Sequence, residues 1–456
     1  MFSKILQSQK AFFASQETKS ISYRISLLQV LKREIISKEQ DIIVAIYKDF
    51  GKPAFETYIT EISVVLSEID LFIKKIKTWS KPKRIKPALL NFPSSEFIYK
   101  DPYGAVLIIS PWNYPFQLAI APLIAAISCG NTVVLKPSEL TPNTSSLLNT
   151  IISKVFKPEH ALVIEGNAEV ASNLLKLNWD YIFFTGSVNV GKIVAKAAAE
   201  HLTPVTLELG GKNPCIIDET ANLKLTAKRL VWGKFLNAGQ TCIAPDYILI
   251  KENIKQEFYN LIKNEIITTY GTNPENSEDF TRIVNEKNFE RLKGFLENET
   301  IVCGGKTNPV TNYIAPTLLD ESKLSSNVMK GEIFGPILPV ISYSSFENIS
   351  ETINNYEKPL ALYVFSNNLK FKTNILNSFS FGGGVINDTI IQFTNHRLPF
   401  GGVGNSGIGA YHGEHSFNTF THQKSIVKKG NWLDLPFRYA PYKNKLNNVK
   451  KLLKWL

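Results

Sequence analysis

The chain is poor in cysteine, and its cysteines stand in no pattern that binds metal or forms a disulfide framework. Four occur among 456 residues, at Cys129, Cys215, Cys242 and Cys303. None belongs to a CxxC pair or a Cys/His cluster, so we expect no metal site. So few cysteines in so long a chain also argue against a disulfide framework and indicate a reducing compartment.

Long hydrophobic runs are also missing. No run approaches the roughly 18 apolar residues that a membrane span needs. The N-terminus, Met-Phe-Ser-Lys-Ile-Leu, lacks the apolar core of a signal peptide. We therefore expect a cytoplasmic protein.

A concentrated basic patch is absent as well, although the net charge is +11. The positive charges are spread along the chain and no nucleic-acid-binding module is found, so a nucleic-acid partner is not expected. The charge is consistent with solubility or with attraction to anionic ligands. The composition, 44% hydrophobic and 20% charged, is that of a globular protein with a large core.

Two regions of alternating strands and helices are predicted after a helical N-terminal segment. Residues 2–79 carry apolar residues at helical spacing, and residues 80–87 break that pattern, as an exposed connector or part of an oligomerising hairpin would. Short apolar runs then alternate with helices, which predicts a parallel, Rossmann-like sheet with strands at 105–109, 132–135, 161–164 and 181–184. A second alternation, from 208 to about 393, predicts a second α/β domain.

One cysteine lies in a turn-prone segment between two predicted elements. The segment Asn237-Ala-Gly-Gln-Thr-Cys-Ile-Ala-Pro245 follows a predicted helix and precedes a predicted strand. Gly239 permits a close turn, and Pro245 prevents the helix from continuing. Such a loop suits a positioned nucleophile at Cys242. A small buried core cysteine fits the same pattern.

Two further segments follow strands of the first predicted sheet, where α/β proteins bind ligands. Lys136-Pro-Ser-Glu139 could hold the hydroxyls of a ribose, or could be a solvated turn. In Phe184-Thr-Gly-Ser-Val-Asn-Val-Gly191, Gly186 and Gly191 allow close backbone approach, and the following helix N-terminus favours a pyrophosphate. The usual GxGxxG fingerprint is absent, and a simple strand-to-helix turn would also fit.

Three other segments carry polar groups suited to catalysis or ligand binding. Pro111-Trp-Asn-Tyr-Pro115 fixes the amide of Asn113 between two prolines, as an oxyanion hole requires, although a structural asparagine is common in turns. Glu208-Leu-Gly-Gly-Lys212 offers a carboxylate that could accept a proton, or a surface glutamate at a domain junction. Glu332-Ile-Phe-Gly-Pro336 pairs a carboxylate with an aromatic ring.

Together these segments resemble the motifs of the NAD(P)-dependent aldehyde dehydrogenase superfamily, from about residue 103 to residue 424. The glycine-dense loop 398–413, with its Gly-Ala-Tyr-His-Gly, resembles the class 3, fatty and aromatic aldehyde branch. The resemblance implies a Rossmann-like NAD-binding domain, a second α/β catalytic domain and a small oligomerisation element. It also favours a homodimer, because the chain lacks the longer N-terminal extension of the tetrameric classes.

The resemblance assigns domain boundaries. The NAD(P)-binding domain would comprise residues 1–80 and 100–207. The catalytic domain would comprise residues 208–394. The oligomerising segments and the C-terminal tail would comprise residues 81–99 and 395–456.

The resemblance also assigns roles to single residues. Cys242 would attack the aldehyde, Asn113 and the Cys242 N–H would stabilise the oxyanion, and hydride transfer to the nicotinamide would leave a thioester. Water activated by Glu208 would release the acid, with the choice between Glu208 and Glu332 as base left open. The residues expected to bind NAD, with NADP also possible, are Lys136, Glu139, Gly186, Ser187, Gly191, Glu332 and Phe334.

Substrate and partners are predicted more coarsely. Tyr114 and Trp232 lie beside motif residues, which predicts an aromatic-lined pocket for medium-chain, long-chain or aromatic aldehydes. The basic tail places Leu446, Val449, Leu453 and Leu456 on one helical stripe. We expect this stripe to pack on the protein's own body or on a dimer partner, with a membrane surface as the alternative. A CoA-acylating dehydrogenase and a non-catalytic membrane-surface protein are the competing functions.

Overall fold

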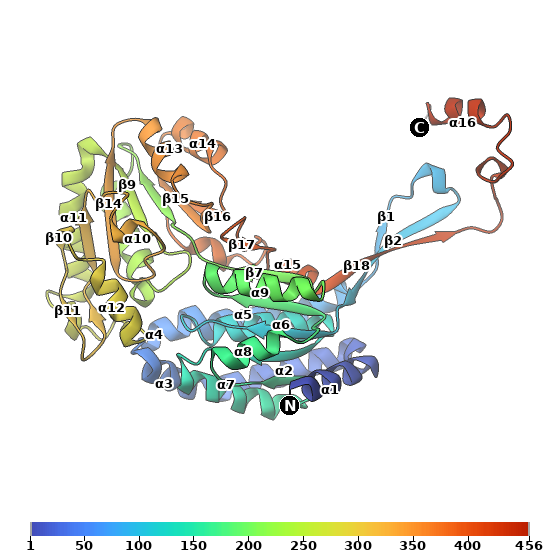
Figure 1. The fold of residues 1–456 in the computed structure, drawn as a ribbon, viewed down its shortest axis with the longest axis horizontal. Coiled ribbons are helices and arrows are strands. Elements are labelled where there is room, and N and C mark those ends of the chain that lie inside the picture. Colours follow the sequence, from blue (N-terminus) through green and yellow to red (C-terminus); the bar gives the residue numbers. More distant parts are fainter. Residues whose placement is uncertain (1, 455–456) are drawn as a thin grey trace.

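The computed structural model describes residues 2–454, which form two α/β bodies and a projecting arm (Figure 1). The sheet of the first body has the strand order β17–β7–β6–β3–β4–β5, and its strands are parallel except β17. The strands are β3 (Ala105–Ile109), β4 (Thr132–Lys136), β5 (Ala161–Val163), β6 (Tyr181–Thr185), β7 (Val205–Glu208) and β17 (Gly407–Ile408). The order reverses between β3 and β6, and ligands bind at such switch points.

Strand β3 shows why these apolar runs become central strands. All five of its residues are buried, and alternate side chains point to opposite faces of the sheet. Val106 and Ile108 enter one hydrophobic core, whereas Leu107 and Ile109 enter another. A strand covered on both faces needs apolar residues at every position, which is the pattern in the sequence.

Helices supply these two cores from opposite faces of the sheet. One core takes its side chains from α2 (Ile21–Ser37), α3 (Glu39–Phe50), α5 (Ser63–Trp79), α6 (Gln117–Cys129) and α7 (Pro142–Val155). The other core takes them from α1 (Phe2–Ala14), α8 (Ala168–Leu175) and α9 (Val188–Glu200). Between α3 and α5, the short helix α4 (Ala54–Thr57) leads into a π-helical turn, η2 (Tyr58–Ile62).

The second body contains a larger sheet with the order β10–β13–β14–β9–β8–β15–β16, parallel except for β10. Its strands are β8 (Pro214–Ile217), β9 (Tyr247–Lys251), β10 (Thr300–Cys303), β13 (Thr317–Asp320), β14 (Ile337–Tyr343), β15 (Ala361–Phe365) and β16 (Gly383–Ile386). The chain crosses into this body directly from β7 to β8. The Glu208–Lys212 segment therefore lies between the two sheets.

The remaining elements of the second body surround its core. The helices are α10 (Leu223–Phe235), α11 (Lys255–Tyr270), α12 (Glu286–Gly294), α13 (Phe346–Asn354) and α14 (Leu369–Ser378), with a small hairpin of β11 (Thr307–Asn308) and β12 (Tyr313–Ile314). Short 3₁₀ turns occur in both bodies and in the arm, at Glu17–Lys19, Leu89–Asn91, Leu236–Gly239, Glu252–Ile254, Pro274–Asn276, Asn327–Met329, Ile391–Thr394 and Pro436–Arg438. These elements enclose one continuous core.

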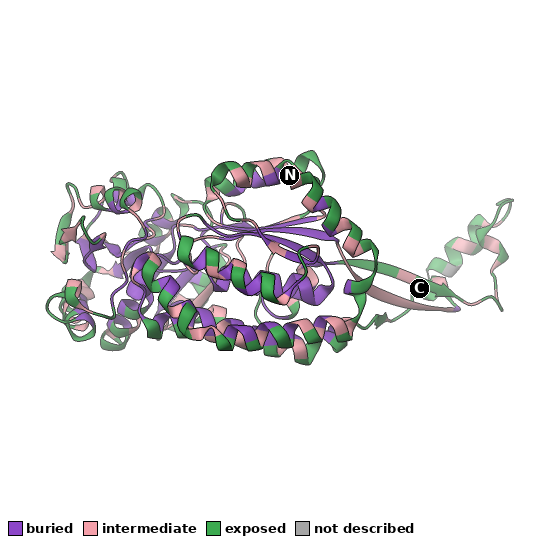
Figure 2. Ribbon diagram, turned by 90° about the horizontal axis from the view of Figure 1, so that it is seen from below, coloured by how far each residue is buried: buried purple, intermediate pink, exposed green. Residues whose placement is uncertain are grey.

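The arm is an antiparallel sheet of β1 (Lys83–Ile85), β2 (Ser94–Pro102) and β18 (Thr421–Lys429). It projects from the first body near α15 (Glu414–Thr419) (Figure 1). Figure 2 shows the arm almost wholly as intermediate and exposed residues, in contrast to the buried interiors of the two bodies. The predicted connector at 80–87 thus includes a strand of this sheet.

The C-terminal helix α16 (Leu446–Leu453) lies beyond the arm, away from both bodies (Figure 1). Leu446 is 64% exposed and Leu453 is 49% exposed, while Leu456 lies outside the described residues. In the described part the stripe does not pack on the protein's own body, so of the two expected packing partners the dimer partner stays a prediction. Among residues 2–454, none of the helices combines the length and apolar character that crossing a membrane requires.

Candidate active site

A left-handed turn presents Cys242 between the two bodies. Helix α10 ends at Phe235, and Asn237, Ala238 and Gly239 then have φ values of 54°, 52° and 72°. A Cβ on Gly239 would lie 2.3 Å from the carbonyl oxygen of Gly335, so only glycine fits there. The predicted strand follows as β9.

Asn113 is fixed beside this turn. The side-chain amide of Asn113 donates to the backbone carbonyl oxygen of Gln240 at 3.0 Å. The backbone carbonyl oxygen of Asn113 accepts from the Asn237 side chain at 2.9 Å. A side-chain amide carries two hydrogens, so the second remains available to a ligand. The prolines of the segment and these bonds together orient the amide beside Cys242.

Two carboxylates border the same space. Both oxygens of the Glu208 carboxylate and one oxygen of the Glu332 carboxylate are buried without a hydrogen-bond partner among the described residues. Burial raises the pKa of Glu208 well above its usual range, and burial together with nearby Asp246 raises the pKa of Glu332 to about 8. The Glu332 carboxylate occupies the space where Gly210 has no side chain.

The protein surroundings disfavour the thiolate of Cys242. Burial raises the pKa of this thiol to about 12, and the negative charges of Glu332 and Glu208 add to the shift. The activation that a nucleophilic thiol needs is therefore not supplied by these neighbours. A base or a positive charge brought by a ligand has to supply it.

Cys242 lies in the wall of two cavities. The first is the more polar of the two, here called the polar cavity, and it is lined by Asn113, Gly186, Ser187, Glu332 and Phe334 as well as by Trp112 and Arg291. The second is almost wholly apolar. The two share the residues Leu118, Thr185, Glu208 and Cys242.

The predicted cofactor residues fall into two groups. Gly186, Ser187, Glu332 and Phe334 line the polar cavity, and the Ser187 hydroxyl caps α9 by accepting from the N–H of Val190 at 3.4 Å. Phe334, at φ 50°, packs edge-to-face on Trp112 with ring centroids 5.2 Å apart.

The other predicted cofactor residues lie outside the lining of that cavity. Lys136 ends β4 and Glu139 follows that strand, and their charged groups are 2.8 Å apart. Burial would raise the pKa of Glu139, but the hydrogen bond and charge of Lys136 outweigh it and lower that pKa. Gly191 packs against Leu209, so its lack of a side chain serves packing of α9 on the sheet.

The predicted substrate residues are separated by the structure. Tyr114 lines the apolar cavity, and its hydroxyl lies 2.6 Å from that of Thr241. Trp232, on α10, is 40% exposed and is absent from the lining of the apolar cavity. Thr226, Leu230, Val231 and Lys234 form the buried face of that helix.

The apolar cavity contains aromatic residues that were not assigned to it from the sequence. Phe393, Phe400, Tyr411 and His412 all line it, and the last three belong to or flank the glycine-dense loop. The rings of Phe400 and His412 stack with centroids 5.1 Å apart, and His412 has φ 86°. The glycine-dense loop itself could have pointed to Phe400, Tyr411 and His412, since these rings interrupt an otherwise flexible sequence.

Cys242 thus lies between a polar cavity at the switch point of the first sheet and an apolar cavity, an arrangement that suits a cysteine nucleophile acting beside a bound ligand. The model of the aldehyde dehydrogenase family matches residues 2–426, and the chain belongs to this family. It is an oxidoreductase that oxidises aldehydes, and enzymes of the family use NAD or NADP.

Similar proteins place the chain more narrowly. It is 48% identical over 447 residues to a 4,4'-diaponeurosporen-aldehyde dehydrogenase of Staphylococcus aureus, covering 98% of this chain and 97% of that protein. It is 44% identical over 424 residues to aldehyde dehydrogenase family 3 member A2 of Macaca fascicularis, covering 93% and 87%. The substrate-bound state of Staphylococcus aureus AldH has a TM-score of 0.97 at 46% identity, covering 99% of both chains. The predicted fold class and the resemblance to the class 3 branch are confirmed.

Proposed function

We propose that this enzyme oxidises aldehydes bearing a long apolar chain or an aromatic ring to carboxylic acids, with Cys242 as the covalent nucleophile. The main support is that an apolar cavity with aromatic walls ends at Cys242. An aldehyde bound there by its apolar part would present its carbonyl carbon to the sulfur. On this view Tyr114 belongs to the substrate pocket and Trp232 does not.

The neighbours of Cys242 suit the first chemical step. Attack of the sulfur on the carbonyl carbon gives a thiohemiacetal with a negatively charged oxygen. The free hydrogen of the Asn113 amide and the Cys242 backbone N–H are the donors that we assign to that oxygen. Because Asn113 is held by two hydrogen bonds to the nucleophile turn, it needs no rearrangement to donate.

The polar cavity fits a nicotinamide cofactor. NAD(P)+ supplies the hydride acceptor and a positive charge when it is bound. The unpartnered oxygen of Glu332 is suited to a ribose hydroxyl, and Ser187 with Gly186 lies at the helix N-terminus, where a pyrophosphate binds. Lys136 and Glu139 would hold the second ribose at the end of β4.

Glu208 is the base that we assign to release of the acid. It lines both cavities, whereas Glu332 lines only the polar one, so Glu208 can reach water on the substrate side. Its raised pKa makes it a stronger base toward water than an exposed carboxylate. A CoA-acylating enzyme would use the CoA thiol in place of water, and a carboxylate at this place favours hydrolysis.

The carboxylate of Glu139 should favour NAD over NADP. It would accept from a ribose 2′-hydroxyl and would repel a 2′-phosphate, with Lys136 reducing the repulsion. Glu139→Gln should therefore raise the ratio of kcat/KM for NADP to that for NAD by about tenfold. Steady-state assays with both cofactors measure this ratio, and a native enzyme that strongly prefers NADP would contradict the assignment.

We also propose a homodimer. The edge strand β16 lacks a neighbour on its outer side among residues 2–454, and an apolar surface with Leu376, Ile386 and Ile391 lies beside it. The arm carries exposed apolar residues of its own, Leu89, Leu90, Phe92, Val427 and Trp432. A second copy would cover both surfaces and the apolar stripe of α16. The free cysteines agree with a cytoplasmic location.

The function is tested with purified enzyme, NAD and NADP, and a panel of aldehydes. Hexanal and benzaldehyde should have higher kcat/KM than acetaldehyde, and added CoA should not change the product from the free acid. Cys242→Ala should abolish oxidation but retain cofactor binding, while Cys303→Ala serves as the matched control. Near-native turnover by Cys242→Ala, or a preference for acetaldehyde, would refute the proposal.

A further inference from the structure

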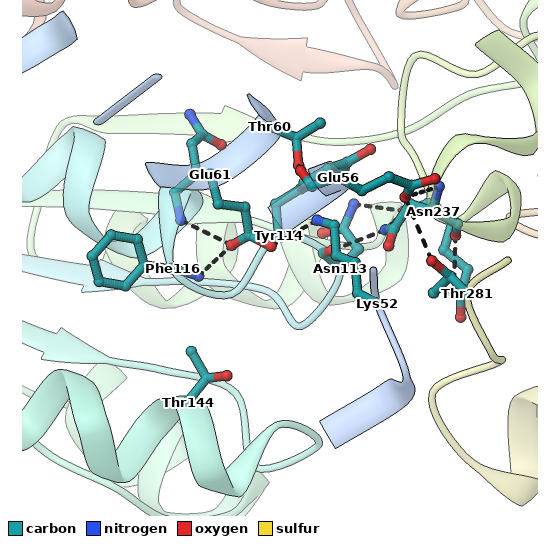
Figure 3. Close-up of polar contacts among 12 residues, drawn as sticks. Lys52, Glu56, Thr60, Glu61, Asn113, Tyr114, Phe116, Thr144, Asn237 and Thr281 are labelled. Carbon is teal, nitrogen blue, oxygen red and sulfur yellow. Dashed lines mark hydrogen bonds and ion pairs between the residues drawn. The ribbon is translucent and has the colours of Figure 1, made fainter. Parts of the chain in front are cut away.

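A carboxylate from the N-terminal helices reaches the nucleophile turn. Glu56 lies on α4, far from Cys242 in the sequence, and only 9% of it is exposed. Its carboxylate oxygen accepts the backbone N–H of Asn237 at 3.0 Å and the hydroxyl of Thr281 at 3.5 Å (Figure 3). The α4 helix is thereby connected to the first residue of the left-handed turn.

Asn237 passes this connection on to the groups around the thiol. Its side-chain amide donates to the carbonyl oxygens of Asn113, at 2.9 Å, and of Gln240, at 3.2 Å. The amide of Asn113 donates to the same Gln240 oxygen. Glu56 is therefore linked to Asn113 by two hydrogen bonds, both made by Asn237. Gln240 lies two residues before Cys242.

Glu56 provides a hydrogen-bond acceptor that the turn requires. The N–H of Leu236 completes the hydrogen bonds of α10 by donating to Trp232, so the buried N–H of Asn237 requires another acceptor. A carboxylate accepts such a bond more strongly than a neutral group does. Because Asn237 and Ala238 both have left-handed backbones, which non-glycine residues disfavour, the turn depends on contacts of this kind.

The π-helical turn η2 carries a second carboxylate, Glu61, which reaches the loop that carries Asn113. Glu61 pairs with the buried ammonium of Lys52 at 2.7 Å and accepts the N–H of Phe116 at 2.8 Å (Figure 3). The same ammonium lies 4.0 Å from the centre of the Tyr114 ring. Residues 52–61 thus contact both the nucleophile turn and the loop that carries Asn113, and π-turns are frequent at functional sites.

We propose that Glu56 is a positioning residue that sets the geometry of the nucleophile turn, so that the Cys242 backbone N–H and the Asn113 amide face one substrate oxygen. This inference rests on the proposed roles of Cys242 and Asn113. Glu56 touches neither substrate nor cofactor and acts through Asn237. The N-terminal helices would then take part in setting catalytic geometry as well as in stabilising the first body.

Glu56→Ala, Glu56→Asp and Glu56→Gln test the proposal, with Glu34→Gln as control. Glu34 is equally buried, on α2, and pairs with Lys154 away from the site. Glu56→Ala and Glu56→Asp should lower kcat at least about tenfold, because small misplacements of reacting groups are costly. The KM for NAD should stay within about twofold, and Glu56→Gln, which keeps an acceptor oxygen, should recover most of kcat.

A second measurement is independent of turnover. The rate at which iodoacetamide alkylates Cys242, followed by mass spectrometry of the peptide, should change at least about fivefold in Glu56→Ala and stay unchanged in Glu34→Gln. Lower melting temperatures with unchanged kcat and alkylation rate would show that Glu56 is only structural. If Glu56→Ala does not fold, Glu56→Asp decides by the same readouts. Failure of the proposed function itself would appear separately, as Cys242→Ala retaining activity.

Discussion

At the scale of single residues, the candidate active site buries three ionisable groups in surroundings that disfavour their negatively charged forms. Cys242, Glu208 and Glu332 share one space, and burial raises all three of their pKa values. The negative charges of Glu332 and Glu208 add to the shift in the pKa of the Cys242 thiol. Such groups cost stability and are retained where chemistry requires them.

The role of Glu208 can be separated from that of the thiol by transient kinetics. Glu208→Gln retains the shape of the residue but cannot accept a proton, so the step that releases the acid should slow. We expect a burst of reduced cofactor close to one equivalent, followed by turnover reduced about 100-fold or more. Stopped-flow absorbance measures both phases. An unchanged steady-state rate would show that Glu208 is not the base that activates water, and Glu332 would be the next residue to test.

The burial of Glu332 should be visible in the pH dependence of stability. Its pKa is about 8 in the folded protein and about 4.5 in the unfolded chain, so its favourable contribution is complete below pH 4.5 and is lost as the pH rises through 8. Glu332→Gln removes this loss. Relative to wild type, the variant should gain about 3 kcal/mol of unfolding free energy between pH 5.5 and 8.

Scanning calorimetry without cofactor across that range checks this expectation. Glu257→Gln, which changes an exposed carboxylate on α11, is the matched control and should run parallel to wild type. If Glu332→Gln also ran parallel, the carboxylate would not be desolvated in the folded protein.

At the scale of elements, the nucleophile turn depends on glycine at one position. Gly239→Ala forces a Cβ onto the carbonyl oxygen of Gly335 at a left-handed residue, and it should cost at least about 2 kcal/mol and most of the activity. Gly271 also has a positive φ, 78°, but a Cβ there meets no atom within 4 Å. With ψ at 178° this backbone is one that almost only glycine adopts, so Gly271→Ala should cost about 1–3 kcal/mol through the backbone alone and leave kcat unchanged.

Melting curves and steady-state rates of the two variants, measured side by side, check this prediction. Equal losses would mean that backbone conformation alone, and not the contact with Gly335, explains the effect.

Elements whose apolar pattern reflects their own burial were predictable from the sequence. Strand β3 was predicted with both its ends correct because a strand covered on both faces is apolar throughout. The arm strand β2 was missed, because all its residues are half-buried and show no alternation. Nothing in the sequence indicated that Trp232 lies outside the lining of the apolar cavity: it is close in sequence to buried residues, but a helix rotates neighbours onto different faces.

The sequence indicated which residues form the candidate site, but not the backbone conformations and distant contacts that hold them in place. Cys242, Asn113 and Glu208 stand in short motifs, and the structure brings them together. The left-handed conformation of Ala238 could not be inferred, since alanine disfavours it and distant contacts impose it. Glu56 lies in no motif and reaches the turn only through the tertiary fold.

At the scale of the whole molecule, the arm exposes apolar side chains that the chain itself does not cover, and we propose that a second copy covers them. Leu90→Asp or Val427→Asp should shift a dimer toward monomer, because a charge would be buried in the proposed interface. Leu202→Asp, at a 91% exposed leucine on the first body, is the control and should leave the dimer intact. Sedimentation at several protein concentrations measures the shift. A wild-type chain that sediments as a monomer would refute the proposed dimer.

The position of Cys242 in the wall of two cavities has a consequence for inhibition. One sulfur can be approached along two routes, so an electrophile's shape decides which ligand protects the enzyme from it. Long apolar reagents should enter through the apolar cavity beside Tyr114 and Phe400 and should be blocked by aldehyde analogues. Nucleotide-like reagents should enter beside Ser187 and Glu332 and be blocked by dinucleotide. Selective inactivators could therefore be built from either side while forming the same bond.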